Sequence, residues 1–445
     1  MSAPATAAPR LARGLGERAA YAPARHPAPV DLKLDANEGR PPRDLPPAAE
    51  LLAALDSDRY PTSAPLERRL AERLGLGPPE VLVTAGADDA LFRACVATLE
   101  PGRELLVATP TFEMLPRYAA LAGGSVRAVP WPDGPFPAGA VASAAGPRTG
   151  LVAVVSPNNP TGGVATADDL RRLAAAAPGA VLLLDHAYVE LADEDLTAAA
   201  LEMPNALVVR TFSKAWGLAG LRVGYAAGRP ALVQALAAAG SPYPCSAASL
   251  AVAAARLATG EADVADYAAR IRVERASLAA LLRRLGARAQ DSQANFVLAR
   301  LARPLWLRDA LAAQGIGVRV FPGRPELADA VRVTCPAGET AFARLARALE
   351  TALAPELVLL DADLAARVPI ATAAADAVPD GDRRRAWQVL GAGASAARVR
   401  AARAAGRVPL VLDPTAAGSA AAGDLLRAGA ARVLASPTEL ESLLS

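Results

Sequence analysis

The chain has 445 residues, of which 53% are hydrophobic and 21% charged, and its formal net charge is +2. This length and composition predict two or three globular domains with enough apolar material for a core. The balanced charge forms neither a basic stripe nor an acidic tail, which argues against nucleic acid or a membrane surface as a partner.

Three scattered cysteines and two histidines offer no spacing typical of a metal site, so we expect no bound metal. The N-terminus lacks the apolar core of a signal peptide, and no apolar run approaches the ~20 residues of a membrane span, so we expect a cytoplasmic protein.

The pattern of apolar runs predicts four units in chain order. Residues 1–45, rich in Pro and Ala, read as an N-terminal arm that ends in the strand-like DLKLDAN. Residues 46–240 alternate fully apolar runs with helical stretches, which predicts a large α/β domain with a mainly parallel sheet buried between helices. Residues 241–355 combine a long helical stretch with short strands and predict a smaller α+β domain. A further predicted strand at PELVLLDADL then begins a truncated α/β unit over residues 356–445.

Lysine is almost absent from the chain. The 47 basic residues include only two lysines, Lys33 and Lys214. Arginine keeps its positive charge, whereas a lysine with a lowered pKa can act as a neutral amine nucleophile. We therefore expect at least one of the two lysines to be retained for its chemistry. Lys33 lies in the strand-like end of the arm and reads as an exposed residue, which leaves Lys214.

Polar residues follow three predicted strands at their carboxyl ends, where parallel sheets bind ligands. The amide of Asn159 follows LVAVVSP, the carboxylate of Asp185 and the phenol of Tyr188 follow VLLL, and Lys214 and Arg222 follow ALVVR. Pyridoxal 5′-phosphate (PLP) needs such a set. A lysine binds its aldehyde, a carboxylate keeps its pyridine nitrogen protonated, and hydroxyls with an arginine hold its phosphate.

At these residues the chain resembles the fold-type I, class I/II aminotransferases, and its sequence motifs are similar to those of the histidinol-phosphate aminotransferase subgroup. The resemblance covers about residues 15–350 and includes LDANE, RYP, SPNNPTG, TFSKAWGLAGLRVGY and ANF. It implies the fold of that family, with a mainly parallel sheet of the seven-stranded type between helices and a smaller α+β domain. It also implies PLP as the cofactor.

The resemblance assigns the catalytic roles to three residues. Lys214 would hold PLP as a Schiff base and later carry a proton between Cα of the substrate and C4′ of the cofactor. Asp185 would pair with the pyridinium nitrogen. Tyr188, together with Asn159, would bind the O3′ oxygen of the ring.

The resemblance also implies the remaining contacts of the cofactor and the substrate. Residues matched to the phosphate site are Ala87, Asp88, Ser213 and Arg222, and Gly86 and Thr211 are also expected to bind the cofactor. Phe112 matches a ring that stacks on the cofactor, and Tyr60 matches a tyrosine that reaches the phosphate of a neighbouring subunit, which implies a homodimer. Residues matched to the substrate side are Arg332, which would anchor an acidic group, and Tyr21, Asn37 and Arg319 near it.

The C-terminal unit resembles a different family. LVLLDAD places Asp361 and Asp363 at the end of an apolar strand, like the first motif of haloacid-dehalogenase-like phosphatases, where the first aspartate is the nucleophile. Residues 393–398 lack the aspartates that would hold Mg²⁺ in that family, and no lysine follows Lys214. Without metal ligands the charge of a transferring phosphoryl group is not compensated. We therefore expect residues 356–445 to be a degenerate, inactive remnant with a packing or assembly role.

These observations together predict a PLP-dependent aminotransferase that moves an amino group from an amine donor to a 2-oxo acid such as 2-oxoglutarate. The resemblance favours histidinol phosphate as donor, and hence a place in histidine and amino-acid biosynthesis, with an aromatic amino acid nearly as compatible. The segments Asn37–Arg40 and Pro242–Ser246 depart from the family pattern on the substrate side, which weakens the choice of donor. Two alternatives stay open: a PLP-dependent decarboxylase of the threonine-phosphate type, and a bifunctional aminotransferase and phosphatase that acts through Asp361.

Overall fold

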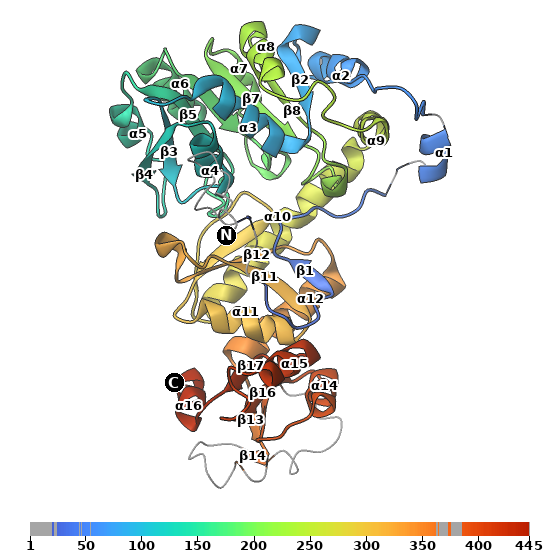
Figure 1. The fold of residues 1–445 in the computed structure, drawn as a ribbon, viewed down its shortest axis with the longest axis vertical. Helices are drawn as coiled ribbons and strands as arrows, with labels where there is room; N and C mark the ends of the chain where they lie inside the picture. Colours follow the sequence, from blue (N-terminus) through green and yellow to red (C-terminus); the bar gives the residue numbers. More distant parts are fainter. Residues whose placement is uncertain are drawn as a thin grey trace, which may run out of the picture.

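The computed structural model describes residues 20–21, 25–43, 45, 47–53, 55–361, 364, 373–374 and 385–444. Three bodies follow one another along the long axis of the molecule, each built around its own sheet (Figure 1). The largest body holds a seven-stranded sheet, and the other two hold five strands each. Among the described helices, none is both long and apolar enough to cross a membrane.

The seven-stranded sheet of the large domain is mainly parallel. In spatial order its strands are β2 (Val81–Thr84), β8 (Gly224–Gly228), β7 (Ala206–Thr211), β6 (Val181–Asp185), β5 (Thr149–Val155), β3 (Glu104–Thr109) and β4 (Ser125–Pro130). Only β8 runs against its neighbours, β2 and β7. The predicted α/β class with a mainly parallel central sheet is confirmed.

The central strands are mostly apolar because helices cover both faces of this sheet. Every residue of β5 and β7 is buried. Successive side chains of a strand point to opposite faces, so alternate residues serve different cores. Thus Val152 and Val154 pack in one cluster, whereas Leu151 and Ala153 pack in the other. The helices of the domain are α2 (Ala64–Leu74), α3 (Gly86–Thr98), α4 (Met114–Leu121), α5 (Ala138–Ala144), α6 (Ala167–Ala176), α7 (Thr197–Leu201) and α8 (Pro230–Ala238).

The small domain contains a sheet to which the N-terminal segment adds a strand. Its order is β1 (Leu32–Leu34), β11 (Ile316–Val320), β12 (Ala330–Thr334), β10 (Phe296–Arg300) and β9 (Arg288–Ala289), with β1 parallel to β11. The long helix α10 (Glu261–Arg284) leads from the large domain into this sheet (Figure 1). The other helices outside the large sheet's core are α1 (Ala48–Ala53), α9 (Ala247–Thr259), α11 (Pro304–Ala313) and α12 (Glu339–Leu353).

The C-terminal unit is a five-stranded, fully parallel sheet packed against the small domain. Its strands, in spatial order, are β14 (Ala373–Ala374), β13 (Leu357–Leu360), β15 (Ala386–Leu390), β16 (Val408–Leu412) and β17 (Arg432–Leu434), with helices α14 (Ala396–Ala404), α15 (Ala420–Ala428) and α16 (Pro437–Leu444). Trp387 of β15 packs on Trp306 of α11 with ring centroids 4.6 Å apart. Both indole N–H groups donate to carbonyls of α12, Trp387 to Thr351 at 2.7 Å and Trp306 to Ala352 at 3.1 Å. A shared core therefore joins this unit to the small domain.

Candidate active site

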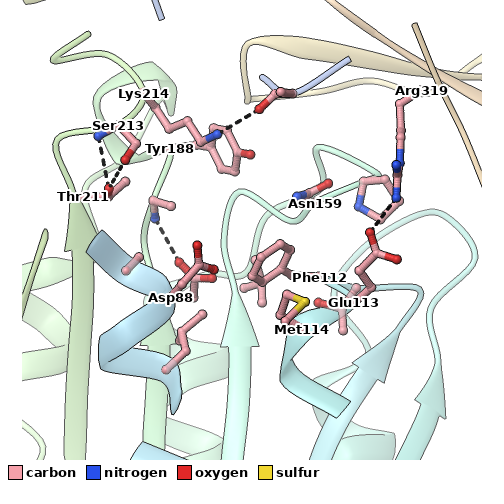
Figure 2. Close-up of a pocket in the computed structure, with 18 of the residues that line it drawn as sticks. Asp88, Phe112, Glu113, Met114, Asn159, Tyr188, Thr211, Ser213, Lys214 and Arg319 are labelled. Carbon is pink, nitrogen blue, oxygen red and sulfur yellow. Dashed lines mark hydrogen bonds and ion pairs between the residues drawn. The ribbon is translucent and has the colours of Figure 1, made fainter. Parts of the chain in front are cut away.

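A pocket of about 370 Å³ opens at the carboxyl ends of the large sheet, between the large and small domains. This is the edge at which open parallel sheets bind ligands, and the volume suits a small molecule. Of the residues expected at the site, thirteen line this pocket: Tyr21, Ala87, Asp88, Phe112, Asn159, Asp185, Tyr188, Thr211, Ser213, Lys214, Arg222, Arg319 and Arg332. Figure 2 shows ten labelled side chains of its wall, including Lys214, Asn159 and Arg319 from three separate elements.

Lys214 lies in the loop between β7 and β8, and its side chain enters the pocket (Figure 2). Its Nζ donates a hydrogen bond to the Ala36 carbonyl at 3.1 Å and lies 5.6 Å from the ring centroid of Tyr188. Burial, with a smaller contribution from the positive charge of Arg332, lowers the pKa of Lys214 from 10.5 to about 8. An amine with this pKa is available as a neutral nucleophile near physiological pH.

Asp185 is the last residue of β6 and is 4% exposed. Its Oδ1 accepts a hydrogen bond from the Ala187 N–H at 3.2 Å, and no ion pair to this carboxylate is formed by any described residue. Burial raises its pKa to about 7. A buried carboxylate without a cation is costly, so the position suits a ligand that brings a positive charge, such as a protonated pyridine nitrogen.

Hydroxyls, an arginine and a helix N-terminus come together at one end of the pocket. Ser213 Oγ accepts from Arg222 Nη1 at 3.1 Å and from Thr211 Oγ1 at 2.9 Å, and Arg222 Nη2 pairs with Asp88 Oδ2 at 3.2 Å. The first residue of α3 is Gly86, which has φ +78° and lies so close that a Cβ there would be 2.6 Å from Arg222 Nη2. Backbone N–H groups of α3, the guanidinium and the hydroxyls fit a phosphate dianion.

Tyr188 is held in place by residues of the other domain. It is 3% exposed, and its hydroxyl accepts a hydrogen bond from Asn37 Nδ2 at 3.0 Å. Asn37 Oδ1 in turn accepts from Thr334 Oγ1 at 2.9 Å. Burial raises the pKa of Tyr188 to about 12, so the phenol stays protonated and can donate a hydrogen bond into the pocket.

The guanidinium of Arg332, on β12 of the small domain, lies in the wall of the pocket. Its Nη1 donates to Asn159 Oδ1 at 2.5 Å and its Nη2 to the Asp35 carbonyl at 2.6 Å. The residue is 6% exposed, and its Nε is buried without a hydrogen-bond partner among the described residues. Burial lowers its pKa to about 10, which still leaves the side chain charged at neutral pH. It is a buried cation placed to bind an anion.

Arg319, on β11, does not stand free in the pocket. Its Nη2 pairs with Glu113 Oε1 at 2.7 Å, as Figure 2 shows, and the ring of Tyr21 lies 5.7 Å from its Cζ. Burial is the main cause that raises the pKa of Tyr21, and its hydrogen bond to Glu113 adds to this effect. The cluster joins the N-terminal segment, the loop before α4 and the small domain.

Three of the expected residues do not line the pocket. Asn37 lies behind Tyr188, and Gly86 supports Arg222 from the start of α3. Tyr60 is 81% exposed and stacks on Tyr243 with ring centroids 4.5 Å apart. Its role toward a neighbouring subunit therefore stays a prediction.

The pocket wall also contains residues that the sequence reasoning missed. Glu113 follows Phe112 directly, yet nothing in the motif PTFEM marks it as the partner of a distant arginine. Arg25, which pairs with Asp35 at 3.0 Å, and Arg324, which pairs with Glu326 at 2.8 Å, were likewise not singled out. Such pairs form between segments far apart in sequence or in an irregular loop, so only their contacts identify them.

Comparison with known proteins agrees with this geometry. The family model described as aminotransferase class I and II matches residues 31–350. The chain belongs to the class I and II aminotransferases. It is 38% identical to the aromatic amino acid aminotransferase of Mycobacteroides abscessus, over 76% of this chain and 99% of that relative. It is 36% identical to a histidinol-phosphate aminotransferase of Acetobacter pasteurianus, over 63% of this chain and 80% of that relative.

A solved structure shares the fold. The histidinol-phosphate aminotransferase of Sinorhizobium meliloti, in complex with PLP, superposes with a TM-score of 0.65 at 26% identity and covers 73% of this chain and 91% of that one. The enzyme is thus a PLP-dependent aminotransferase of fold type I. The histidinol-phosphate subgroup and the haloacid-dehalogenase-like remnant, both expected from the sequence, do not follow from these matches.

The residues of this aminotransferase fit PLP and divide its binding among them. Asp185 would face the ring nitrogen, and Ser213, Arg222 and the start of α3 would hold the phosphate. When bound, PLP supplies an aldehyde for an amine and a ring that accepts the electron pair released when a proton leaves the substrate.

The protein's own groups supply the acid–base and binding steps. Lys214, with a pKa of about 8, can exist as the free amine that attacks an aldehyde, and the same Nζ can take up and return a proton. Arg332 can bind an acidic group of the substrate and so orient it next to Lys214. Its bond to Asn159 fixes the direction of the guanidinium.

Proposed function

We propose that the enzyme takes its amino group from a donor that carries a ring and one anionic group, with histidinol phosphate as the favoured donor and 2-oxoglutarate as the acceptor. The observation that carries this proposal is the buried guanidinium of Arg332. Among the described residues it forms no ion pair, although it lies in the wall of the pocket. A buried cation without a counter-ion is unfavourable, so a substrate anion would both gain and supply electrostatic stabilisation there.

The other arginines of the pocket support this choice because each already has a carboxylate partner. Arg25 pairs with Asp35, Arg319 with Glu113 and Arg324 with Glu326. Arg332 is therefore the arginine of the pocket wall whose charge is left for a ligand. The rings of Tyr21, Phe112 and Phe321 line the same pocket and suit an imidazole or aromatic ring.

An aromatic amino acid is the second candidate donor. Its carboxylate would bind Arg332 in place of the phosphate. The identity of 38% to an aromatic amino acid aminotransferase, over nearly the whole of that relative, favours it. The two donors differ in charge at the anionic group, because a phosphate monoester carries up to two negative charges and a carboxylate one.

The experiment is a half-reaction followed by the visible absorption of the PLP-loaded protein. Histidinol phosphate, phenylalanine and tyrosine are added in turn, and the true donor converts the absorption band of the Lys214-bound cofactor, which 2-oxoglutarate then restores. Lys214→Ala removes the band and serves as the control. Release of carbon dioxide from an amino-acid donor, with the absorption band of the cofactor aldimine retained, would assign the decarboxylase instead.

Arg332→Ala tests the observation itself. We expect its kcat/KM for the donor to fall by about 100-fold, since truncating a buried charge that binds a charged partner costs on the order of 2–5 kcal/mol. PLP content should stay at the wild-type level. Arg25→Ala, which removes an arginine already paired with Asp35, is the matched control and should change kcat/KM far less. An equal loss in both variants contradicts the role given to Arg332.

We also propose that the C-terminal unit has no phosphatase activity. Asp361, the candidate nucleophile, accepts from the Gly391 N–H at 2.8 Å and from Arg398 Nη2 at 2.8 Å, so each of its oxygens already has a partner. Asp363 lies outside the described residues. Mg²⁺-dependent phosphate release that Asp361→Asn abolishes would refute the proposal and support the bifunctional alternative.

We further propose that the enzyme is a cytoplasmic homodimer. The exposed Tyr60, stacked on Tyr243, supports a subunit interface at this surface. Sedimentation velocity of the holoenzyme tests it, and a single monomeric species would contradict it.

A further inference from the structure

A groove of about 770 Å³, separate from the active site, lies between the small domain and the C-terminal unit. Five arginines line it: Arg344 and Arg347 from α12, Arg400 and Arg403 from α14, and Arg427 from α15. Most of the remaining wall is alanine, glycine and proline. A concave surface of this volume with small apolar walls and converging charged groups has the form of a small-molecule site.

Among the residues that the structure describes, positive charge exceeds negative charge in the lining of this groove. Asp31 binds Arg344 through both carboxylate oxygens, at 2.5 and 2.8 Å. Asp424 pairs with Arg427 at 2.7 Å, but these side chains are 72% and 64% exposed, so their pair contributes little. The pKa of Glu356 is lowered mainly by a hydrogen bond from the Arg385 backbone N–H, and the positive charge of Arg347 contributes to the shift. The charge of Arg347 is thus partly compensated by Glu356. Among the described residues that line the groove, five are arginine and none is aspartate or glutamate.

The groove is physically connected to the active site through the N-terminal segment. Arg403 Nη2 donates to the Pro29 carbonyl at 2.7 Å, and the Asp31 N–H donates to the Gly315 carbonyl at 3.0 Å. The chain continues directly into β1, and the carbonyls that follow it bind Arg332 and Lys214 in the active site.

Gly315 packs tightly against Asp31 of the N-terminal segment and Arg344 of the groove. Gly315 has φ +84°, and a Cβ there would be 2.3 Å from Asp31 Oδ1 and 2.5 Å from Arg344 Nη2. A ligand that draws Arg344 or Arg403 toward itself therefore changes the contacts of Pro29 and Asp31.

We propose that this groove binds a small phosphorylated anion, such as a polyphosphate or a metabolite with more than one phosphate group, and that its binding orders residues 29–37 next to the active site. Guanidinium groups bind phosphate oxygens bidentately, and several of them together match more than one phosphate. Arg400, Arg403 and Arg427 lie beyond residues 31–350, the span matched by the aminotransferase family. The C-terminal unit thereby contributes half of a regulatory site that the catalytic domains alone lack.

The binding test uses the PLP-loaded holoenzyme, so that the phosphate site of the active pocket is filled. Inorganic pyrophosphate is titrated by calorimetry at constant ionic strength. We expect one saturable site, with a Kd at least ten times higher in Arg400→Ala/Arg427→Ala. These two arginines are chosen because the contacts that tie the groove to Pro29 and Asp31 come from Arg403 and Arg344 instead.

The matched control is Arg68→Ala/Arg270→Ala, which removes two exposed arginines elsewhere and should leave the Kd unchanged. Absence of saturable binding, or equal weakening in both double variants, overturns the site. Should the test variant fold poorly, the wild-type protein gives an independent answer. Pyrophosphate should protect Arg400 and Arg427 from phenylglyoxal, as detected by peptide mass spectrometry, and unchanged modification overturns the proposal.

Hydrogen exchange tests the link to the active site without reference to any donor. Pyrophosphate should slow exchange of a peptide covering residues 29–37 in the wild-type holoenzyme and have no such effect in Arg400→Ala/Arg427→Ala. Binding without slower exchange overturns the regulatory part. Because neither readout requires turnover, a wrong choice of amine donor leaves both results interpretable.

Discussion

The cofactor side and the substrate side of the pocket are built in different ways. The cofactor side consists of strand ends of one sheet, where Asp185 closes β6 and Lys214 follows β7. The substrate side joins three distant segments: the N-terminal segment with Tyr21, the loop with Glu113, and the small domain with Arg319 and Arg332.

The two sides differ in the interactions that hold their functional side chains in position. On the cofactor side, buried backbone ladders of β5, β6 and β7 set the positions. On the substrate side, side-chain pairs between segments set them, such as Arg319 with Glu113 and Arg332 with Asn159. Chemistry that needs fixed geometry is thus placed on the rigid sheet, whereas selectivity resides in contacts that single substitutions can alter.

The largest expected effect within this comparison comes from breaking the rigid side. Asp185→Asn removes the buried charge that faces the cofactor but keeps its shape. We expect kcat to fall by about 10²- to 10³-fold, the range for losing one preorganised electrostatic group, while Lys214 still binds PLP. Steady-state kinetics together with PLP content measure this.

The control is Asp193→Asn, a carboxylate in a surface loop that is 69% exposed. It should retain wild-type kcat. Full activity in Asp185→Asn would show that the ring nitrogen needs no buried anion in this enzyme.

The contrast between the two sides also explains what the sequence could predict. Asn159, Asp185 and Lys214 each follow an apolar run within a few residues, so local pattern and strand order already placed them together. The scarcity of lysine further distinguished Lys214 as a chemically important residue. The α/β class followed from the same apolar runs.

The partners on the substrate side could not be found in this way. The Arg319–Glu113 pair spans 206 positions, and the hydrogen bond from Thr334 to Asn37 spans 297. No local periodicity encodes such contacts, because they depend on how the small domain and the N-terminal segment pack. The arginines of the C-terminal groove were equally hidden, since single arginines along helices read as solvated surface until α12, α14 and α15 bring them together.

A smaller effect should appear in the pH dependence of cofactor loading. The neutral form of Lys214 is the reactive one, and its pKa of about 8 makes that form scarce below pH 8 and dominant above it. We expect the rate of PLP binding to apoenzyme to rise about tenfold per pH unit up to pH ~8 and then to level off. Stopped-flow absorbance measures the rate.

Arg332→Ala sharpens this test because the charge of Arg332 is the second cause of the lowered pKa, after burial. Removing the charge should shift the profile to higher pH. A rate that keeps rising toward pH 10 in the wild-type enzyme would mean that Lys214 has the pKa of an ordinary lysine.

The smallest expected effect comes from the substrate side, where Glu113 neutralises Arg319. Glu113→Gln keeps the shape of the side chain but removes its charge and leaves Arg319 as a second unpaired cation near Arg332. Ligands with two negative charges, such as 2-oxoglutarate or histidinol phosphate, should then bind about two- to fivefold more tightly, the scale of a partly exposed ion pair. The KM of a monoanionic aromatic amino acid should hardly change.

Steady-state kinetics with each ligand measure these changes, and Glu72→Gln on the exposed face of α2 controls for the loss of one negative charge. A uniform change for all ligands would show that the Glu113–Arg319 pair supports the pocket wall instead of selecting the charge of the substrate.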